Sequence, residues 1–217
     1  MARPQVTLKL ATSLDGKIAL ANGMSEWITG EKAREEGRKL RATHDAIAVG
    51  SNTAVLDNPQ LTTRLSGEPD PIRVIFDTKL RLSPKSNLAL TAKETPVWVF
   101  TDVTTGHMAN TLKDLEVRLI KTPVSLCIDL EAALQTLHEN GVKSLLVEGG
   151  GTLAASFLRL EAVDVIEWFR APMILGGDSR GSIGDLGLED MNFAKRFSRI
   201  EIKDLGDDIH ERYERIV

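Results

Sequence analysis

Short apolar runs that alternate with helical patterns constrain the fold of this chain more than any other feature. The apolar runs occupy residues 45–50, 72–77, 97–101 and 144–148. An earlier strand pattern, which alternates, lies at Val6–Ala11. Helical patterns lie at Lys32–Ala42, within Leu126–Asn140 and at Thr152–Leu160. Apolar runs of this length without strict alternation are typical of strands buried on both faces of a parallel sheet. The order of segments predicts an α/β fold with a mostly parallel central sheet and helices on both faces.

The C-terminal third departs from this alternation. Val163 to Arg170 and the segments that start at Ser198 and Ile209 have strand patterns with no helical pattern between them. We expect antiparallel strands added at one edge of the sheet. The intervening stretch from Gly176 to Met191 carries five glycines and is interpreted as a mobile surface loop. No linker composition is visible, so a single domain over residues 1–217 is expected.

Composition limits the partners and the compartment. Lys and Arg number 27 against 31 Asp and Glu, which gives a net charge of −4. That balance argues against binding nucleic acid or an anionic membrane through bulk charge, but it leaves room for a local phosphate pocket. The single cysteine, Cys127, excludes an internal disulfide and a multi-cysteine zinc site, and is interpreted as a small apolar filler. Without a signal core or a run of ~20 apolar residues, we expect a soluble, cytoplasmic protein that binds no metal.

A glycine-rich turn is the sharpest chemical signal. In Val147 to Phe157 a buried strand runs through three glycines into a helix. Glycines allow close approach of the backbone to a ligand, and the first helical turn offers N–H donors that suit a pyrophosphate. The spacing differs from G-x-G-x-x-G, so a tight turn without a ligand is an equal reading. Glu148 ends the strand, where open α/β sheets bind ligands, or it is a solvated loop carboxylate.

Four further residues have both a structural and a functional interpretation. Lys9 lies in an apolar strand, which indicates an edge strand, a side chain that reaches solvent, or a role in a site. Trp27 is either a core residue or part of a site. Arg41 and Arg64 would suit a phosphorylated substrate, or they form surface salt bridges.

Five segments together resemble one family. They are Arg3 to Ala19, Ser25 to Arg34, Leu40 to Arg64, Val147 to Phe157 and Val163 to Arg180. The chain is similar over nearly its whole length to the reductase half of the bacterial bifunctional riboflavin-biosynthesis deaminase/reductase. That resemblance implies a dihydrofolate-reductase-like fold. It also implies NADPH-dependent reduction of 5-amino-6-(5-phosphoribosylamino)uracil to its ribitylamino form, in a homodimer.

The resemblance also implies site residues. Positions that match the cofactor site are Ala11, Trp27, Thr53, Asp57, Thr78, Gly150, Gly151, Thr152, Leu153, Ala154, Ala155 and Ser156. Positions that match the substrate site are Ser25, Arg41, Leu61, Arg64 and Glu148. Lys9 is a candidate catalytic residue that would polarise the opening sugar. The four histidines match no motif position and are interpreted as structural or surface residues.

Cofactor preference has one sequence argument on each side. Thr78, Lys79 and Arg81 follow a predicted strand, and a hydroxyl with two cations suits the 2′-phosphate of NADPH. Asp77 argues the other way, because an acidic residue on the ribose is typical of sites that prefer NADH.

Alternatives remain open for the substrate and for the class of protein. The zinc deaminase signature that precedes the reductase half in the bifunctional enzyme is absent from this sequence. Deamination would then fall to another protein, or the substrate is the aminated 2,5-diamino pyrimidinone phosphate. A dihydrofolate reductase proper would use an acidic residue such as Glu31, Glu35 or Glu36. A nucleotide-binding protein that has lost the reaction is the non-enzymatic alternative.

Overall fold

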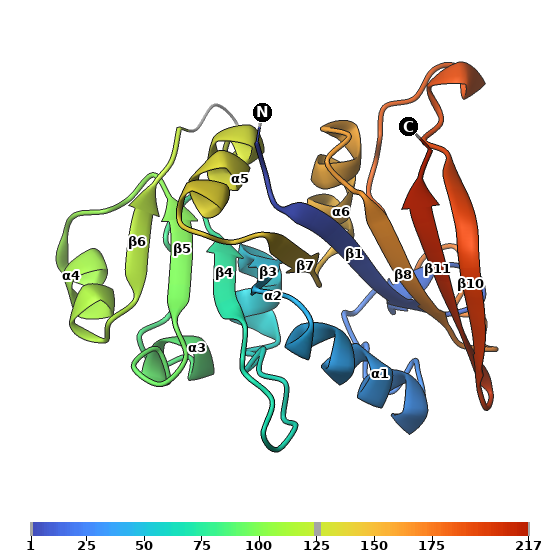
Figure 1. The fold of residues 1–217 in the computed structure, drawn as a ribbon, viewed down its shortest axis with the longest axis horizontal. Coiled ribbons are helices and arrows are strands. Elements are labelled where there is room, and N and C mark those ends of the chain that lie inside the picture. The colour runs from blue at the N-terminus through green and yellow to red at the C-terminus, as the bar shows by residue number, and fades with distance from the viewer. Residues whose placement is uncertain (1, 124–126, 217) are drawn as a thin grey trace. The chain divides into compact units, whose positions relative to one another are not determined.

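The computed structural model describes residues 2–123 and 127–216, and its chain forms two compact units. Unit 1 comprises residues 1–5 and 38–146, and unit 2 comprises residues 6–37 and 147–217 (Figure 1). No helix within the described residues is both long and apolar enough to cross a membrane. The prediction of one domain over residues 1–217 stays a prediction.

Unit 1 is built on a parallel sheet with strand order β7-β3-β4-β5-β6. Its strands are β3 (Ala46–Gly50), β4 (Ile72–Phe76), β5 (Val97–Thr101), β6 (Arg118–Lys121) and β7 (Ser144–Val147). Its helices are α2 (Ser51–Leu56), α3 (Asn87–Leu90), α4 (His107–Asp114) and α5 (Leu130–Glu139). The apolar residues of β3, β4 and β5 are buried except for the half-buried Ile72 and Trp98, as expected for strands covered on both faces.

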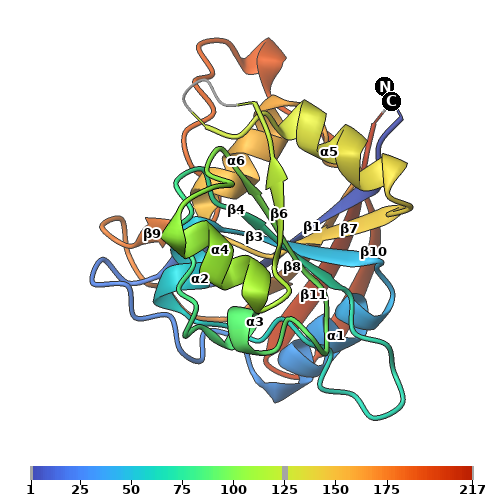
Figure 2. The same cartoon turned by 90° about the vertical axis from the view of Figure 1, so that its left-hand side faces the viewer.

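The strand order decides which face each helix covers. The chain moves in one direction from β3 to β6, and then returns across the sheet to β7. Because crossovers between parallel strands are right-handed, α2, α3 and α4 cover one face and α5 covers the other. Figure 2 shows α4 and α5 on the two sides of β6. The predicted helices on both faces are therefore present in unit 1.

Unit 2 holds the antiparallel strands. Its sheet order is β10-β11-β8-β1, with β1 (Gln5–Thr12) parallel to β8 (Val165–Arg170) and β11 (Asp208–Arg215) antiparallel to both β8 and β10 (Phe197–Leu205). Its remaining elements are α1 (Glu31–Ala42), which begins in unit 2, α6 (Gly151–Arg159), β2 (Lys17–Ala19), β9 (Arg180–Gly181) and the short 3₁₀ helix at Met191–Phe193. The predicted antiparallel C-terminal strands are confirmed.

A buried polar cluster lies within the unit 2 sheet. Glu167 on β8 is 2% exposed and accepts hydrogen bonds from Arg212 at 2.6 Å and from the His210 ring at 2.7 Å. The His210 ring stacks on Phe169 with 4.2 Å between the ring centres. The pairing neutralises a carboxylate that burial would otherwise destabilise. His210 is thus a structural residue, as the sequence predicted.

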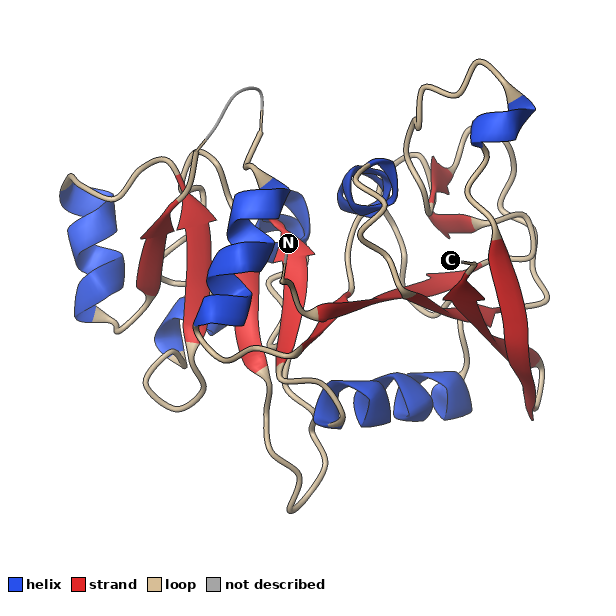
Figure 3. Cartoon of the chain, turned by 45° about the horizontal axis from the view of Figure 1, so that its top comes forward, coloured by secondary structure: helices blue, strands red, loops and turns tan. Residues whose placement is uncertain are grey.

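The segment from Gly176 to Met191 differs from the predicted surface loop. It contains β9, which pairs with β2 in a two-stranded sheet (Figure 3, where strands are red and loops tan). The Ser179 and Ser182 side chains are buried. Asp15 accepts hydrogen bonds from the Leu175 and Gly176 N–H groups. The Ser13 hydroxyl and these N–H groups lower the pKa of Asp15 to about 2. The first part of the segment is therefore fastened to unit 2 at several points.

Cys127 is the clearest error among the core predictions. Its side chain is exposed and not an apolar filler. It precedes α5, whose N-cap is Asp129, and the apolar face of that helix begins only at Leu130. Leu126, where the segment predicted to contain this helix begins, lies outside the described residues.

Candidate functional site

The glycine-rich turn joins β7 to α6, and backbone geometry requires two of its three glycines. Gly150 has a φ of 55°, a conformation that side chains disfavour. A Cβ on Gly151 would lie 2.6 Å from the Gly181 carbonyl oxygen, closer than real Cβ contacts. The Gly184 N–H also donates to the Gly151 carbonyl at 2.8 Å. The turn is thus shaped both by its own conformation and by the segment packed on it.

The residues after the turn divide into two groups. The N–H groups of Leu153 and Ala154 donate to the Gly150 carbonyl, which leaves those of Gly151 and Thr152 as candidate donors to a phosphate. The side chains of Ala154 and Ala155 are buried. The Ser156 hydroxyl, one turn further on, donates to the Thr152 carbonyl at 3.0 Å. Of the predicted residues after the turn, those in the first turn of α6 are therefore the better candidates for contact with a phosphate.

A strained loop in unit 1 carries two of the predicted substrate residues. Leu61 and Arg64 have φ values of 58° and 53°, and Asn58 has 42°. Each such residue costs on the order of 1–2 kcal/mol, and strain of this kind gathers at functional sites. Leu61 is buried, whereas the Arg64 side chain is exposed.

Three side chains hold this loop. The Arg41 guanidinium donates to the Thr62 carbonyl at 2.9 Å, and Asp70 accepts from the Thr63 N–H at 2.7 Å. Arg73, fully buried on β4, donates to the Gln60 carbonyl at 3.3 Å. The structure thus brings Arg41 to the loop that bears Leu61 and Arg64.

Three of the predicted cofactor residues lie at the carboxyl ends of adjacent unit 1 strands. Thr53 is on α2, directly after β3, and Asp57 caps the end of that helix. Thr78 follows β4 by two residues, and its carbonyl accepts from the Asp102 N–H at 3.2 Å. In open α/β sheets this edge is where ligands bind.

The Asp77 carboxylate is buried and so does not compete with the 2′-phosphate of NADPH. It is 1% exposed, and its Oδ2 accepts a hydrogen bond from the Leu82 N–H at 2.8 Å. Burial raises the pKa of Asp77, which outweighs the lowering by backbone N–H groups. A carboxylate shut off from solvent cannot bind a ribose. Arg81 in the same turn is exposed, and Asn52 orients it through a 2.7 Å hydrogen bond.

The remaining predicted cofactor and substrate residues, three from the N-terminal segment and Glu148, lie in unit 2. Ser25 is exposed, Ala11 is half-buried near the end of β1, and Glu148 is half-buried directly after β7. Trp27 is 68% exposed and has a φ of 65°, so its interpretation as a core residue is wrong.

Gly37 on α1 has no side chain, which leaves room for the side chain of Lys9. The Lys9 Cε lies 3.6 Å from the position that a Cβ on Gly37 would take. Its Nζ lies 5.6 Å from the centre of the Phe169 ring, within reach of a cation–π attraction. A small residue on the helix and an aromatic ring on the neighbouring strand thus allow a half-buried lysine here.

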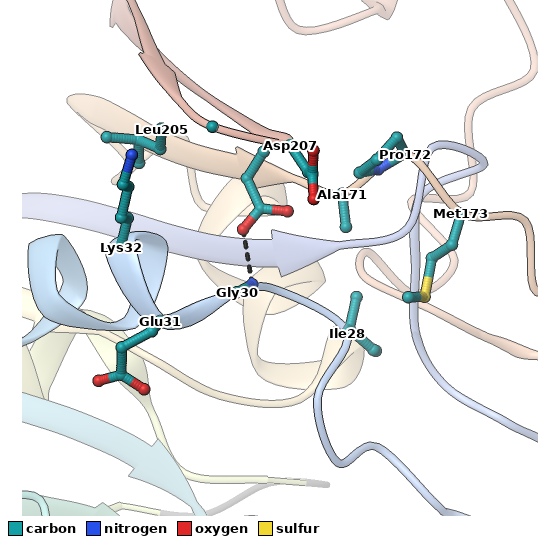
Figure 4. Close-up of a pocket in the computed structure, with 11 residues that line it drawn as sticks. Ile28, Gly30, Glu31, Lys32, Ala171, Pro172, Met173, Leu205 and Asp207 are labelled. Carbon is teal, nitrogen blue, oxygen red and sulfur yellow. Dashed lines mark hydrogen bonds between the residues drawn. The ribbon is translucent and has the colours of Figure 1, made fainter.

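Unit 2 also contains a pocket of about 500 Å³ beside the start of α1 (Figure 4). Its lining includes Ile28, Gly30, Lys32, Pro172, Met173 and Asp208. The Gly30 N–H donates to Asp208 Oδ2 at 2.6 Å, which ties the residue before α1 to the start of β11. None of the predicted cofactor or substrate residues lines the pocket, but Glu31, an acidic candidate of the dihydrofolate reductase alternative, does.

Sequence reasoning missed residues that hold the site rather than form it. A charged residue inside the apolar run of β4 was the available signal for Arg73. Arg34 lies within the Ser25–Arg34 motif but was not singled out. Nothing local marks Asp208, because its partner is 178 residues away. No group of three or more potential metal ligands occurs among the residues that the structure describes.

The chain is similar to known proteins over nearly its whole length. Residues 4–210 match the family model of the RibD C-terminal domain. The riboflavin biosynthesis protein RibD of Bacillus amyloliquefaciens is 36% identical over 209 residues, which are 95% of this chain and 56% of that protein. The chain thus spans about half the length of several curated relatives that it matches.

Two further matches carry more specific names. A 2,5-diamino-6-ribosylamino-4(3H)-pyrimidinone 5′-phosphate reductase of Methanothermobacter thermautotrophicus is 36% identical over 97% of this chain and 98% of its own length. A crystal structure of a diaminohydroxyphosphoribosylaminopyrimidine deaminase/5-amino-6-(5-phosphoribosylamino)uracil reductase from Thermotoga maritima has a TM-score of 0.82 and 32% identity. It is matched over 99% of this chain and 57% of that one. The expected α/β fold and the family resemblance are confirmed, and the chain belongs to the family of the RibD C-terminal domain.

Proposed function

We propose that this protein reduces the ribosyl chain of a phosphoribosylamino-pyrimidine to a ribityl chain in riboflavin biosynthesis, with NADPH as the reductant. The observation that carries the proposal is the match with the archaeal reductase, which extends over nearly the full length of both proteins. That relative is named for a reductase activity alone, so a chain of this size suffices for such a reaction.

The cofactor proposal rests on the glycine turn and on the unit 1 strand ends. NADPH, when bound, supplies the hydride. The N–H groups of Gly151 and Thr152 at the start of α6 would hold its pyrophosphate, and the positive φ of Gly150 shapes the turn that presents them. Thr78 and Arg81 would bind the 2′-phosphate, and the burial of Asp77 removes the competing acidic group. Ala11, Trp27, Thr53 and Asp57 complete the proposed set.

The substrate proposal assigns the anionic end of the molecule to the two arginines. Arg64 is exposed in a strained loop, and Arg41 holds that loop through Thr62. These guanidinium groups would bind the phosphate or the chain hydroxyls. Leu61 and Ser25 complete the proposed substrate set. Glu148 would orient the pyrimidine or the sugar, and Lys9 would favour opening of the sugar by stabilising the departing oxygen.

Two substrates differ only in one ring substituent. The sequence resemblance implies the deaminated 5-amino-6-(5-phosphoribosylamino)uracil, and the Thermotoga maritima protein is named for reduction of that compound. The aminated 2,5-diamino pyrimidinone phosphate is the second candidate, because the full-length archaeal relative is named for it.

An NADPH-oxidation assay with both pyrimidines side by side tests the proposal. We expect turnover of one or both compounds, none of dihydrofolate, and a kcat/KM with NADH at least tenfold below that with NADPH. Turnover of dihydrofolate alone would replace the proposal with the related reductase. A protein that oxidises no NADPH and whose Tm is unmoved by excess NADPH would be a non-catalytic member.

Replacing Arg64 tests the substrate assignment. We expect Arg64→Ala to raise the KM for the phosphorylated substrate at least tenfold, a loss of about 2 kcal/mol for a charge-assisted contact. Its effect on the KM for NADPH should be small. Arg118→Ala, at an exposed arginine on β6, is the matched control. An unchanged KM for the substrate would remove Arg64 from the site.

Two remaining expectations stay predictions. The resemblance implies a homodimer. The strand β10 exposes two apolar side chains, Ile200 at 54% and Ile202 at 51%. From the sequence, the apolar run from Val163 to Leu175 is either an interface strand or core. In unit 2 its residues up to Ala171 are mostly buried, whereas Met173 and Ile174 are exposed, so both interpretations stay open. A cytoplasmic location is the prediction from the sequence.

A further inference from the structure

Trp27 has a combination of properties that folding stability does not explain. Its side chain is 68% exposed, so little of the ring is removed from water. Its backbone φ is 65°, in the region that residues with a Cβ disfavour. An exposed aromatic ring on a strained backbone requires neighbouring groups that hold it there, and such outliers gather at functional sites.

Arg34 supplies three contacts to the segment that bears Trp27. Its guanidinium lies over the indole, with 4.3 Å between its central carbon and the centre of the ring. It donates to the Thr29 carbonyl at 2.7 Å and to the Glu31 carboxylate at 2.5 Å. The Arg34 N–H also donates to the Gly30 carbonyl at 3.1 Å, which places the side chain on the first turns of α1. One side chain thus links the helix, the turn before it and the indole.

The chemistry of arginine suits this task. A planar guanidinium can stack on an indole while its edges donate in fixed directions, and a lysine ammonium cannot do both. The Arg34 side chain is 32% exposed, so its contacts are partly shielded from water. Glu31 fixes the orientation of the guanidinium and balances its charge.

We propose that Arg34 is a positioning residue that acts through Trp27, holding the indole in the orientation that the nicotinamide dinucleotide contacts. This inference rests on the proposed function, in which Trp27 belongs to the cofactor set. It predicts that Arg34 affects NADPH affinity only while Trp27 is present.

The test is a double-mutant cycle on NADPH affinity with the full chain. We expect Arg34→Ala and Trp27→Ala each to raise the Kd for NADPH about tenfold, and the double variant to resemble Trp27→Ala within twofold. Arg34→Lys should fall between wild type and Arg34→Ala. Arg118→Ala is the matched control, because Arg118 makes the same kind of stacking contact with Trp98 at 4.5 Å. It should leave the Kd within twofold.

A spectroscopic measurement separates positioning from a general loss of structure. The chain labelled with 5-fluorotryptophan has three fluorine resonances, and Trp27→Phe identifies the one from Trp27. We expect Arg34→Ala to shift only this resonance, and Arg118→Ala to shift only that of Trp98. In wild type NADPH should move the Trp27 resonance, and in Arg34→Ala it should move it only at about tenfold higher concentration.

The outcomes distinguish the inference from the proposed function. If wild type neither binds nor oxidises NADPH, both fail. If wild type binds NADPH but Arg34→Ala binds it equally well, the inference alone is overturned. The same holds if Arg34→Ala weakens binding equally with and without Trp27, or if it shifts all three resonances.

Discussion

Arg73→Met is expected to lower the free energy of unfolding by about 4 kcal/mol, equivalent to a fall in Tm of about 12 °C. Arg73 is fully buried, and its guanidinium donates to Thr91 Oγ1 at 2.7 Å and to the carbonyls of Gln60, Thr91 and Thr95. Burial lowers its pKa to about 10, which still leaves the side chain charged at neutral pH. Methionine fills part of the volume but removes the guanidinium donor from the Thr91 hydroxyl and from the Gln60 and Thr95 carbonyls, of which the Thr95 bond is buried. The Thr91 carbonyl keeps the backbone N–H groups of Glu94 and Thr95 as donors. Calorimetry or thermal unfolding measures the change.

The control for Arg73 is Arg118, an exposed arginine with fewer hydrogen bonds. Arg118→Met removes an exposed cation that bonds Asn140 and stacks on Trp98, and it should cost less than about 1 kcal/mol. A Tm for Arg73→Met within about 2 °C of wild type would show that the Gln60–Thr95 region repacks without the guanidinium. Since Arg73 also anchors Gln60, we further expect a raised KM for the substrate.

Gly151→Ala is expected to destabilise the protein by about 3 kcal/mol and to weaken NADPH binding at least tenfold. The new Cβ would lie 2.6 Å from the Gly181 carbonyl oxygen and 3.2 Å from the Gly184 nitrogen. Both neighbours are backbone atoms, so the clash cannot be relieved by rotating a side chain. The segment 181–184 must move away from α6, and the proposed pyrophosphate turn moves with it. Thermal unfolding and an NADPH titration measure the two effects.

Gly177→Ala is the matched control for this substitution. It lies in the same segment, has no atom within 4 Å of an added Cβ, and has an ordinary backbone conformation. We expect its Tm and NADPH affinity to match those of wild type. If Gly151→Ala kept both values, neither the packing at Gly181 nor the pyrophosphate role of this turn would stand.

The sequence predicted the long, periodic elements well. The strands β3, β4, β5 and β7 and the helices α1, α5 and α6 begin or end within a few residues of the predicted segments. Their apolar runs reflect burial on two faces, a property that composition alone reveals. The sequence-based prediction missed α2, α3 and α4. Each of these helices has at most eight residues, which is too few turns to show the periodicity of a helix. The prediction also missed β6, whose four residues are only partly buried.

The candidate site was predicted as a set of residue types and not as an arrangement. Motif resemblance supplied Arg41, Arg64 and the glycine turn, and the structure added the strain at Leu61, Arg64 and Trp27. No local pattern reveals a positive φ in a residue other than glycine, since tertiary contacts impose it. The burial of Asp77 is a similar case, because the exposed fraction of a side chain depends on how the whole unit packs around it.

The amino-acid sequence by itself determined the α/β character of the chain, the place of the glycine turn and the family. These follow from periodicity, from the absence of a Cβ and from adjacent residues, all of which are local. Only the tertiary structure decided which partners satisfy Arg73, why Gly37 faces Lys9, and that Asp208 bonds the residue before α1. Those contacts join segments that are distant in the chain, and their energy depends on burial and direction, which no local pattern encodes.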